Sequence, residues 1–350
     1  MGVRPRTREA KRAVQYPPLK KGGRGDSRGE AAVRDIRADR IRVRIEGKDD
    51  LRYVVGIDAG GSKTVGLLAG EDGEVRAEAR AGGANLQVQG ELGVEKVLYE
   101  ILERLEPPGP IAAVCLGMAG VDRPGERDVI HGVLRRLGLH WTSRTRIEND
   151  AFIALVAGAA ERVGIVVVAG TGSVAYGVDA AGRTARSGGW GYLLGDEGSA
   201  YWLGHAALRR AIRAADGRDE ETSLVDRLAR RLDLEVPAGL VSWFYDQEHF
   251  RFRVAELAPL VEEAAAAGDR AAVELIDHGA EHLARAARAV ARQLAFPGHF
   301  PLVLSGGAFR ACPSLGERLR ASLELPRARV TRLVTEPARG AVTLALDLLR

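Results

Sequence analysis

Two glycine-rich turns, each between two short β-strand patterns, constrain the fold of this chain more than any other feature. The first is residues 58–64 (DAGGSKT), between YVVGI and VGLLAG, and the second is residues 170–173 (GTGS), between GIVVV and VAYGV. A glycine turn that joins adjacent strands exposes backbone N–H groups and small hydroxyls, which suits a polyphosphate. Two such turns predict two similar half-folds that hold one nucleotide from opposite sides, and therefore phosphoryl transfer or nucleotide-driven switching.

Neither turn fits the phosphate loops that open a helix. A Walker A loop requires G-x-x-x-x-G-K-[ST], but Ser62 intervenes before the lysine and VGLLAG has the pattern of a strand. The second turn matches G-x-G-x-x-[GA] through Gly170, Gly172 and Ala175, yet a hairpin pattern rather than a helix follows it. Both mismatches favour a phosphate loop of the strand–turn–strand kind.

The expected elements occur twice in a similar order. The first run has strands at 53–57, 65–70, 74–80, 111–117 and 145–148, with helices at about 91–105, 125–137 and 151–160. The second has strands at 163–169, 173–178, 183–187, 301–307 and 328–333, a mostly helical stretch at about 196–292, and helices at 314–323 and 338–349. The helix at 91–105 is expected to bury a stripe that includes Leu92. This order predicts an α/β fold of two similar layered halves.

Composition is that of a globular protein with two domains. The chain has 350 residues, 46% of them hydrophobic and 28% charged. No apolar run approaches the roughly 18–20 residues that span a bilayer, and no secretory signal is evident. Cys115 and Cys312 give neither a disulfide framework nor a metal-binding spacing, so we expect a cytoplasmic protein with no membrane partner.

Residues 1–50 differ from the rest of the chain. They contain 15 Lys and Arg against 8 Asp and Glu, whereas the whole chain has a net charge of only +4. Residues 1–30 are rich in proline, glycine and charge, which predicts disorder. We interpret 1–50 as a dispensable basic leader; contact with nucleic acid or an anionic surface through it is the alternative. Residues 41–45 (IRVRI) could add an edge strand.

Two carboxylates end expected strands. Asp58 could hold Mg²⁺, usually through water, or could simply cap its turn. Lys63 could contact phosphate or be a solvated strand residue. Asp150 lies at the carboxyl end of a strand, where α/β proteins collect their chemistry, and a general base there could accept a hydroxyl proton. An N-cap is the structural alternative for Asp150.

Two further glycine-rich segments suggest ligand contacts. Residues 188–199 (GGWGYLLGDEGS) combine carboxylates, small residues and an aromatic platform, which suits a polyol, although Asp196 could instead cap the following helix. Residues 305–308 (SGGA) follow a strand and would allow close backbone approach to a flat ligand such as adenine. A plain strand-to-helix turn is the alternative there.

Together these segments resemble the N-acetylglucosamine kinase branch of the BadF/BadG/BcrA/BcrD ATPase family, within the actin-like, Hsp70-like and sugar-kinase superfamily. The resemblance covers about residues 53–350, and residues 188–208 (GGWGYLLGDEGSAYWLGHAAL) carry its most specific part. It implies two actin-like, ribonuclease H-like domains with a nucleotide cleft between them. The first would comprise 51–160 plus 338–350, and the second 161–337 with a helical insertion.

The resemblance also implies an activity and its residues. The activity would be ATP- and Mg²⁺-dependent phosphorylation of an amino sugar at its 6-OH, by an enzyme family in which homodimers are common. Asp150 would be the catalytic base, and with it Asn85, Trp190, Gly191 and Asp196 would contact the sugar. The residues expected around ATP are Gly60, Gly61, Ser62, Lys63, Thr64, Gly170, Thr171, Gly172, Ser173, Ala255, Gly306 and Gly307, with Asp58 at the metal.

Some residues depart from the family pattern, and two other functions stay open. Met118–Ala119 replaces a serine-rich sugar contact of animal relatives, and Ser187 replaces a cysteine. These changes leave N-acetylglucosamine, glucosamine and N-acetylmuramic acid as possible acceptors. The alternatives are an ATPase that activates an iron–sulfur dehydratase or reductase, which would need cluster-binding cysteines, and a catalytically silent sugar sensor.

Overall fold

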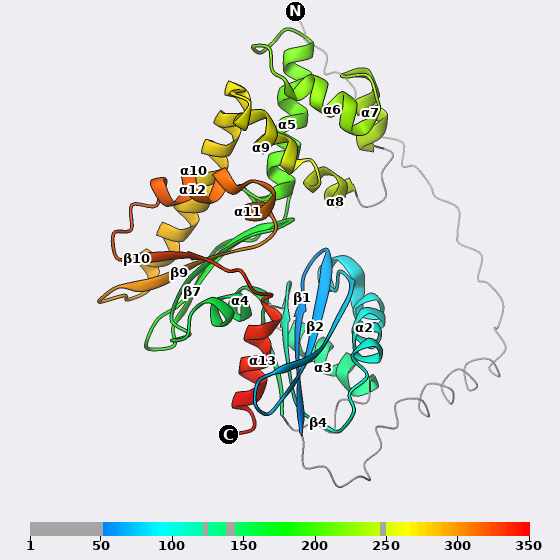
Figure 1. The fold of residues 1–350 in the computed structure, drawn as a ribbon, viewed down its shortest axis with the longest axis vertical. Helices are drawn as coiled ribbons and strands as arrows, with labels where there is room; N and C mark the ends of the chain where they lie inside the picture. The colour runs from blue at the N-terminus through cyan, green and yellow to red at the C-terminus, as the bar shows by residue number, and fades with distance from the viewer. Residues whose placement is uncertain (1–51, 122–124, 138–143, 246–249) are drawn as a thin grey trace, which may run out of the picture. The chain divides into compact units, whose positions relative to one another are not determined.

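The computed structural model describes residues 52–121, 125–137, 144–245 and 250–350, and contains two five-stranded mixed sheets (Figure 1). The expected leader, 1–50, and the possible strand at 41–45 lie outside the described residues. The first sheet has the order β3-β2-β1-β4-β5. Its strands are β1 (Tyr53–Ala59), β2 (Lys63–Gly70), β3 (Val75–Gly82), β4 (Ile111–Met118) and β5 (Thr145–Asn149). The strands β1, β2 and β3 are antiparallel neighbours, while β4 and β5 run parallel to β1.

Helices cover both faces of the first sheet. The helix α2 (Leu86–Leu105) packs on β2 and β3, and with α3 (Glu126–Arg136) it buries one apolar cluster. On the opposite face, α4 (Asp150–Gly158) and α13 (Ala338–Asp347) bury a second cluster. The C-terminal helix therefore packs on β1 and β4, although it follows the strands of the second sheet in sequence.

The helix expected at 91–105 differs from the structure at its beginning. It starts at Leu86, and Gly90 interrupts it with a φ of 64° and ψ of 176°. Leu92, expected in the buried stripe, is 80% exposed, whereas Val94 is fully buried. The expectation for Leu92 was wrong because the buried stripe of the helix after Gly90 consists of Val94, Leu98, Ile101 and Leu105, and Leu92, two residues before Val94, lies on the opposite side of the helix.

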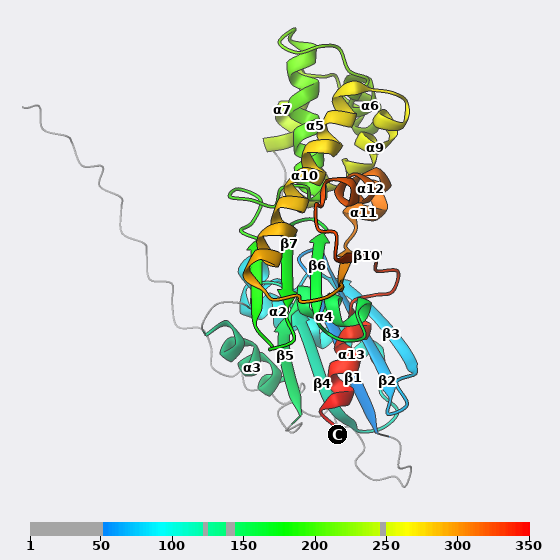
Figure 2. The same ribbon diagram turned by 90° about the vertical axis from the view of Figure 1, so that its left-hand side faces the viewer.

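The second sheet has the order β10-β9-β6-β7-β8 and repeats the strand–turn–strand start of the first. Its strands are β6 (Gly164–Ala169), β7 (Ser173–Val178), β8 (Thr184–Gly188), β9 (Phe300–Ser305) and β10 (Ala328–Arg332). The helix α10 (Arg270–Gln293) lies along β7 and β8 (Figure 2). The helix α4 packs on the other side of this sheet, where its Leu155 joins a cluster with Val166 and Val303.

A helical segment lies between β8 and β9 in the chain, as expected. It contains α5 (Ala200–Ala215), α6 (Leu224–Leu232), α7 (Ala238–Tyr245), α8 (Phe250–Ala255), α9 (Ala258–Ala266) and α10, and α11 (Ala308–Ala311) and α12 (Pro313–Ser322) follow β9. Side chains of these helices share one apolar core with the second sheet. Among the described helices, none is long and apolar enough to cross a bilayer. The α/β class and the repeated order of elements are confirmed.

Candidate active site

The predicted catalytic base, Asp150, and the predicted metal-holding carboxylate, Asp58, lie at the carboxyl ends of strands of the first sheet. Asp58, one residue before the end of β1, pairs in register with Gly117 of β4, and Gly117 pairs with Glu148 of β5. Asp150 follows two residues later as the first residue of α4. Because the carboxyl ends of parallel strands meet at one edge of a sheet, both carboxylates belong to the same edge. The negative charge of Asp150 raises the pKa of Asp58, which agrees with this proximity.

Asp58 is a half-buried carboxyl in a region of excess negative charge. Burial, followed by repulsion from Asp150, raises its pKa from 3.8 to about 7. The cation of Lys63 opposes the shift, and the carboxylate of Glu336 adds to it. A pair of carboxylates with a net deficit of positive charge is a donor set that fits a hard divalent cation such as Mg²⁺. Asp58 is therefore suited to hold Mg²⁺, directly or through water.

Asp150 does not cap α4, so the structural alternative considered for it was wrong. The N-cap is Asn149, whose side chain accepts a hydrogen bond of 2.7 Å from the backbone N–H of Ala151. Asp150 is instead the first helical residue, and its Oδ1 lies 2.9 Å from the same nitrogen. A carboxylate in the first turn is favoured by the helix dipole. Asn149 is thus the cap of α4, and Asp150 is an acidic side chain in the first turn of that helix.

Lys63 has a partner that the sequence did not indicate. Its Nζ lies 3.2 Å from Oε2 of Glu336, a residue between β10 and α13. Glu336 also accepts a hydrogen bond of 2.8 Å from Arg80 of β3. Burial acts to raise the pKa of Glu336, but the hydrogen bonds from Arg80 and Lys63 outweigh it and lower that pKa. Lys63 is therefore more than a solvated strand residue, because its ammonium group pairs with a carboxylate. Its contact with phosphate stays a prediction.

The segment that contains Asn85 packs directly on the first glycine turn. A Cβ on Gly83 would lie 2.1 Å from the carbonyl oxygen of Gly61, so only glycine permits this approach. Asn85 caps α2 by accepting a hydrogen bond of 2.9 Å from the N–H of Gln87. Its Oδ1 would lie 3.3 Å from a Cβ on Gly120, which follows β4. The predicted sugar contact therefore lies beside the first turn, with a capping role that the sequence did not reveal.

The second turn meets two of the other predicted segments. A Cβ on Gly172 would lie 2.7 Å from Oδ2 of Asp196, and a Cβ on Gly306 would lie 2.2 Å from the carbonyl oxygen of Ala169. The N–H of Ala200 donates a 2.8 Å hydrogen bond to the carbonyl oxygen of Gly170. The structure thus brings the second turn, the loop at 188–199 and the segment around Gly306 together at the end of β6.

Asp196 is a buried loop carboxylate, and the N-cap role considered for it was wrong. Ser199 caps α5 by accepting a 3.1 Å hydrogen bond from the N–H of Trp202. Asp196 has a φ of 59°, a left-handed conformation that costs energy in a residue with a Cβ. Burial raises its pKa even though the backbone N–H groups of Ser173 and Gly191 donate to it. A strained, buried acid without a capping role is a candidate for ligand contact.

Trp190 is held at the surface of the same loop by Arg186 of β8. The indole is 65% exposed, and the Arg186 guanidinium lies 5.0 Å from the centre of its ring. Arg186 Nε also donates a 3.1 Å hydrogen bond to the carbonyl oxygen of Gly188. The neighbouring Gly191 has a φ of 88°, a left-handed conformation that favours glycine. Arg186, which the sequence did not indicate, therefore fixes the exposed aromatic platform.

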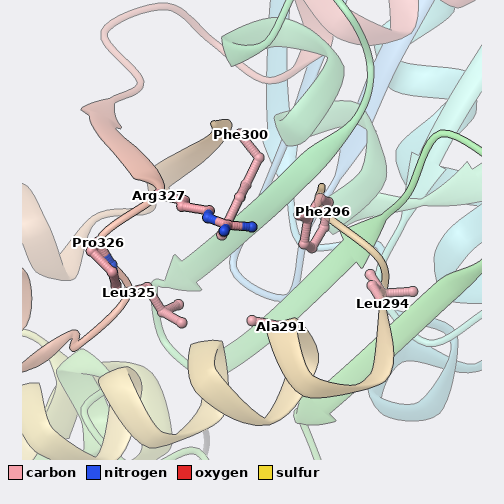
Figure 3. Close-up of a pocket in the computed structure, with 7 residues that line it drawn as sticks. All are labelled: Ala291, Leu294, Phe296, Phe300, Leu325, Pro326 and Arg327. Atoms are coloured by element: carbon pink, nitrogen blue, oxygen red, sulfur yellow. The ribbon is translucent and has the colours of Figure 1, made fainter. Parts of the chain in front are cut away.

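The remaining predicted residues are two hydroxyls of the turns themselves and one alanine away from them. Ser62 is exposed and Thr171 half-buried, as expected for turn hydroxyls that are to meet a ligand. Ala255 is the last residue of α8 and packs against the helical core. Nothing in its described surroundings joins it to a turn. The hollow in Figure 3 lies between the end of α10, β9 and β10, is lined by apolar side chains and Arg327, and contains none of the predicted site residues.

The two cysteines are buried thiols in separate parts of the fold. Cys115 lies in β4, and burial raises its pKa to about 12. Cys312 lies between α11 and α12, where burial and a 2.9 Å hydrogen bond to Glu262 raise its pKa. Cluster ligands must be thiolates that can reach a shared metal site. Neither cysteine has the exposure or the charge environment that this role requires.

Comparison with known proteins identifies the family and supports the fold. A curated N-acetylmuramic acid/N-acetylglucosamine kinase from Clostridium acetobutylicum is 34% identical over 303 residues, which cover 84% of this chain and 98% of that protein. An N-acetyl-D-glucosamine kinase from Dictyostelium discoideum is 31% identical over 84% of this chain and 97% of its own length. The solved structure of a candidate N-acetylglucosamine kinase from Chromobacterium violaceum is 27% identical with a TM-score of 0.66, covering 85% of this chain and all of that one.

The family assignment extends over nearly all the described residues. The model of the BadF/BadG/BcrA/BcrD ATPase family matches residues 55–345, a range that includes both glycine turns, both sheets and the Trp190–Asp196 loop. A ROK family glucokinase from Streptomyces griseus, solved with glucose and AMPPNP, shares the fold at a TM-score of 0.52 and 17% identity, over 85% of this chain and 98% of its own. This chain belongs to the BadF/BadG/BcrA/BcrD ATPase family.

Proposed function

We propose that this protein is an ATP-dependent amino-sugar kinase. The observation that carries the proposal is the pair of carboxylates, Asp58 and Asp150, at one sheet edge beside a glycine turn. Two relatives that match nearly their full length are named as kinases of N-acetylglucosamine, and one also of N-acetylmuramic acid. These sugars and glucosamine are therefore the proposed acceptors.

In this proposal Asp150 acts on the acceptor hydroxyl, which is the 6-OH. Its carboxylate orients the hydroxyl and accepts its proton while the sugar oxygen forms a bond to the γ-phosphorus of ATP. The bond between that phosphorus and the bridging oxygen of ADP breaks in the same displacement. The position of Asp150 as the first residue of α4 supports this role, because its side chain is not needed to cap the helix.

The phosphates of ATP would lie between the two glycine turns. Backbone N–H groups of the turns and the hydroxyls of Ser62 and Thr171 would donate to phosphate oxygens, and Lys63 would add a positive charge. Asp58 would hold Mg²⁺, which neutralises charge on the phosphates when bound. The raised pKa of Asp58 supports this, because a nearby cation would remove the electrostatic strain between the two carboxylates.

The acceptor sugar would contact residues from two loops, one that follows β3 of the first sheet and one that follows β8 of the second. Asn85, next to the first turn, and Asp196, next to the second, would hydrogen-bond to sugar hydroxyls. Trp190, with Gly191 beside it, would provide the exposed aromatic face on which a sugar ring packs. Gly306 and Gly307 would allow the adenine to approach the backbone, with Ala255 also near the nucleotide.

We further propose the organisation of the chain and its setting. One domain would comprise residues 51–160 with 338–350, and the other 161–337, which agrees with the packing of α13 on β1 and β4. The protein would work in the cytoplasm, where ATP is available, and as a homodimer. Light scattering on the purified protein would measure its oligomeric state.

Two other functions have less support from the structure. An ATPase that activates an iron–sulfur enzyme would need accessible thiolates, and both Cys115 and Cys312 are fully buried. A silent sugar sensor would have no need for a strained pair of carboxylates at the phosphate turn, because that pair raises the free energy of the ligand-free fold.

The decisive experiment is a coupled assay of ADP release by purified protein with Mg²⁺ and ATP. The acceptors should include glucose, glucosamine, N-acetylglucosamine and N-acetylmuramic acid. We expect release that depends on an amino sugar. ADP release that no sugar stimulates, with sugar binding retained, would indicate the sensor instead.

A further inference from the structure

Arg251 of α8 is a half-buried cation that lies on two aromatic rings. Its guanidinium lies 5.6 Å from the ring centre of Tyr192 and 5.0 Å from that of Phe252. Among the described residues, no hydrogen bond or ion pair of this guanidinium is seen. Most other half-buried arginines that the structure describes have such partners; Arg210, for example, pairs with Asp219. A cation on two aromatic faces, with no polar partner in the part of the chain that the structure describes, is preorganised to meet an anion.

This cation faces the loop that we propose binds the acceptor. Tyr192 belongs to the segment 188–199, two residues after the exposed Trp190. The positive charge of Arg251 acts to lower the pKa values of Asp196, in the same segment, and of Tyr201, in α5. Arg251 is therefore electrostatically coupled to the residue that would hydrogen-bond to the sugar, although it lies some 55 residues later in the chain.

The donors of Arg251 are not used by Asp196. That carboxylate is hydrogen-bonded by the backbone N–H groups of Ser173 and Gly191. A guanidinium has five N–H donors in a planar fork, whose geometry matches the two oxygens of a carboxylate. The aromatic rings contact only the faces of the guanidinium, and no described residue uses its edge donors, which can therefore bind a ligand. A neutral sugar offers this cation hydroxyls alone, whereas an acidic sugar offers it a charge-assisted bidentate pair.

We infer that Arg251 is a specificity-determining residue that binds the carboxylate of an acidic amino-sugar acceptor. The inference rests on the proposed kinase function and names the acceptor class of the same site. The probe for this class is N-acetylmuramic acid, which is N-acetylglucosamine bearing an ether-linked lactate. The two sugars therefore differ by the group that Arg251 would recognise.

The test compares the two sugars in wild type and in Arg251→Gln and Arg251→Lys. We expect Arg251→Gln to lower kcat/KM for N-acetylmuramic acid about 10- to 100-fold, the usual value of a charge-assisted hydrogen bond, mainly through KM. For N-acetylglucosamine the change should stay within about threefold. Arg251→Lys should recover part of the loss, because it restores the charge without the fork.

Arg253 provides a matched control on the same helix. Its guanidinium also lies over an aromatic ring, 5.6 Å from the centre of Trp243, but its side chain is exposed and that ring belongs to α7 rather than to the 188–199 segment. Arg253→Gln should change kcat/KM for neither sugar. Equal melting temperatures of the variants would show that the fold is intact.

The outcomes separate this inference from the proposed function. A loss of equal size with both sugars would show that Arg251 only positions the loop, and would overturn the inference. Unchanged kcat/KM for both sugars in Arg251→Gln would also overturn the inference. A wild type that phosphorylates N-acetylglucosamine but not N-acetylmuramic acid would overturn it too. In all these cases the kinase function would stand. A wild type that phosphorylates no amino sugar would instead refute the kinase function itself.

Discussion

Replacing Asp58 by asparagine should stabilise the ligand-free protein while it removes activity. The pKa of Asp58 rises from 3.8 to about 7 on folding, so the folded state disfavours the ionised carboxylate. A group whose pKa is raised in the folded state gives its full contribution to stability below its unfolded pKa and loses it as the pH rises through the folded pKa. The free energy of unfolding should therefore fall between about pH 4 and pH 7. Asparagine, which has no charge, avoids this loss.

The size of the effect follows from the shift. Each pKa unit corresponds to about 1.4 kcal/mol, so a shift of about 3 units costs the wild type up to about 4 kcal/mol above pH 7. At pH 5 the wild type has lost only about 1.6 kcal/mol of its free energy of unfolding in this way. The difference in free energy of unfolding between Asp58→Asn and wild type should therefore grow by up to about 3 kcal/mol between pH 5 and pH 8. For a protein of this size about 1 kcal/mol changes the melting temperature by roughly 2–4 °C.

Differential scanning fluorimetry at pH 5 and pH 8, without nucleotide or Mg²⁺, measures this difference. The matched control is Asp226→Asn, at an exposed carboxylate in the first turn of α6, which should behave alike at both pH values. If the Asp58→Asn variant is no more stable than wild type at pH 8, or is equally stabilised at both pH values, then the ionised Asp58 carboxylate does not destabilise the ligand-free protein. Its phosphotransfer should be lost at both, because the proposed Mg²⁺ site would lack its carboxylate.

Three further substitutions test other parts of the site. Asp150→Asn should reduce turnover by about 10²–10⁴-fold with ATP binding retained, as measured by initial rates and calorimetry; near-normal turnover would remove Asp150 from the role of base. Glu336→Gln should destabilise the protein by about 1 kcal/mol at pH 7 in urea unfolding, because Lys63 loses its ion pair, and the difference should shrink below pH 4.5 and disappear as the pH falls through the lowered pKa of Glu336 in the folded protein; a difference that stays constant from pH 7 down to the acid unfolding of the protein would contradict this. Arg186→Ala should raise KM for the sugar about 10-fold and leave KM for ATP unchanged, because Trp190 loses its support; a parallel rise in both would indicate general disorder instead.

Much of the fold was predictable because its signals are local. Apolar runs and glycine turns placed the strands of both sheets within a few residues, and the strand after each turn excluded a helix-opening loop. The same patterns placed Asp58 and Asp150 at strand ends, where the parallel pairing of β1, β4 and β5 brings them to one edge. Kinks are less visible: Gly90 was not expected to interrupt α2.

The partners of side chains were not predictable from local pattern. Lys63 and Glu336 are 273 residues apart, and only the packing of α13 on the first sheet brings them together. Arg186 and Arg251 are ordinary arginines in sequence, and their roles appear only when the loop at 188–199 is folded against them. The caps of α4 and α5 could have been found, since asparagine and serine are preferred N-cap residues, and this would have freed Asp150 and Asp196 for other roles.

The central claim is that the chain transfers the γ-phosphoryl group of ATP to an amino sugar with Asp150 as the base. The most direct measurement supplies ATP labelled in its γ-phosphate, with Mg²⁺ and N-acetylglucosamine or N-acetylmuramic acid, and follows the label by chromatography and mass spectrometry. We expect label in a sugar phosphate with wild type and about 10²–10⁴-fold less of it per unit time with Asp150→Asn. Label that appears only as inorganic phosphate, or in a sugar phosphate formed equally fast by both proteins, would contradict it.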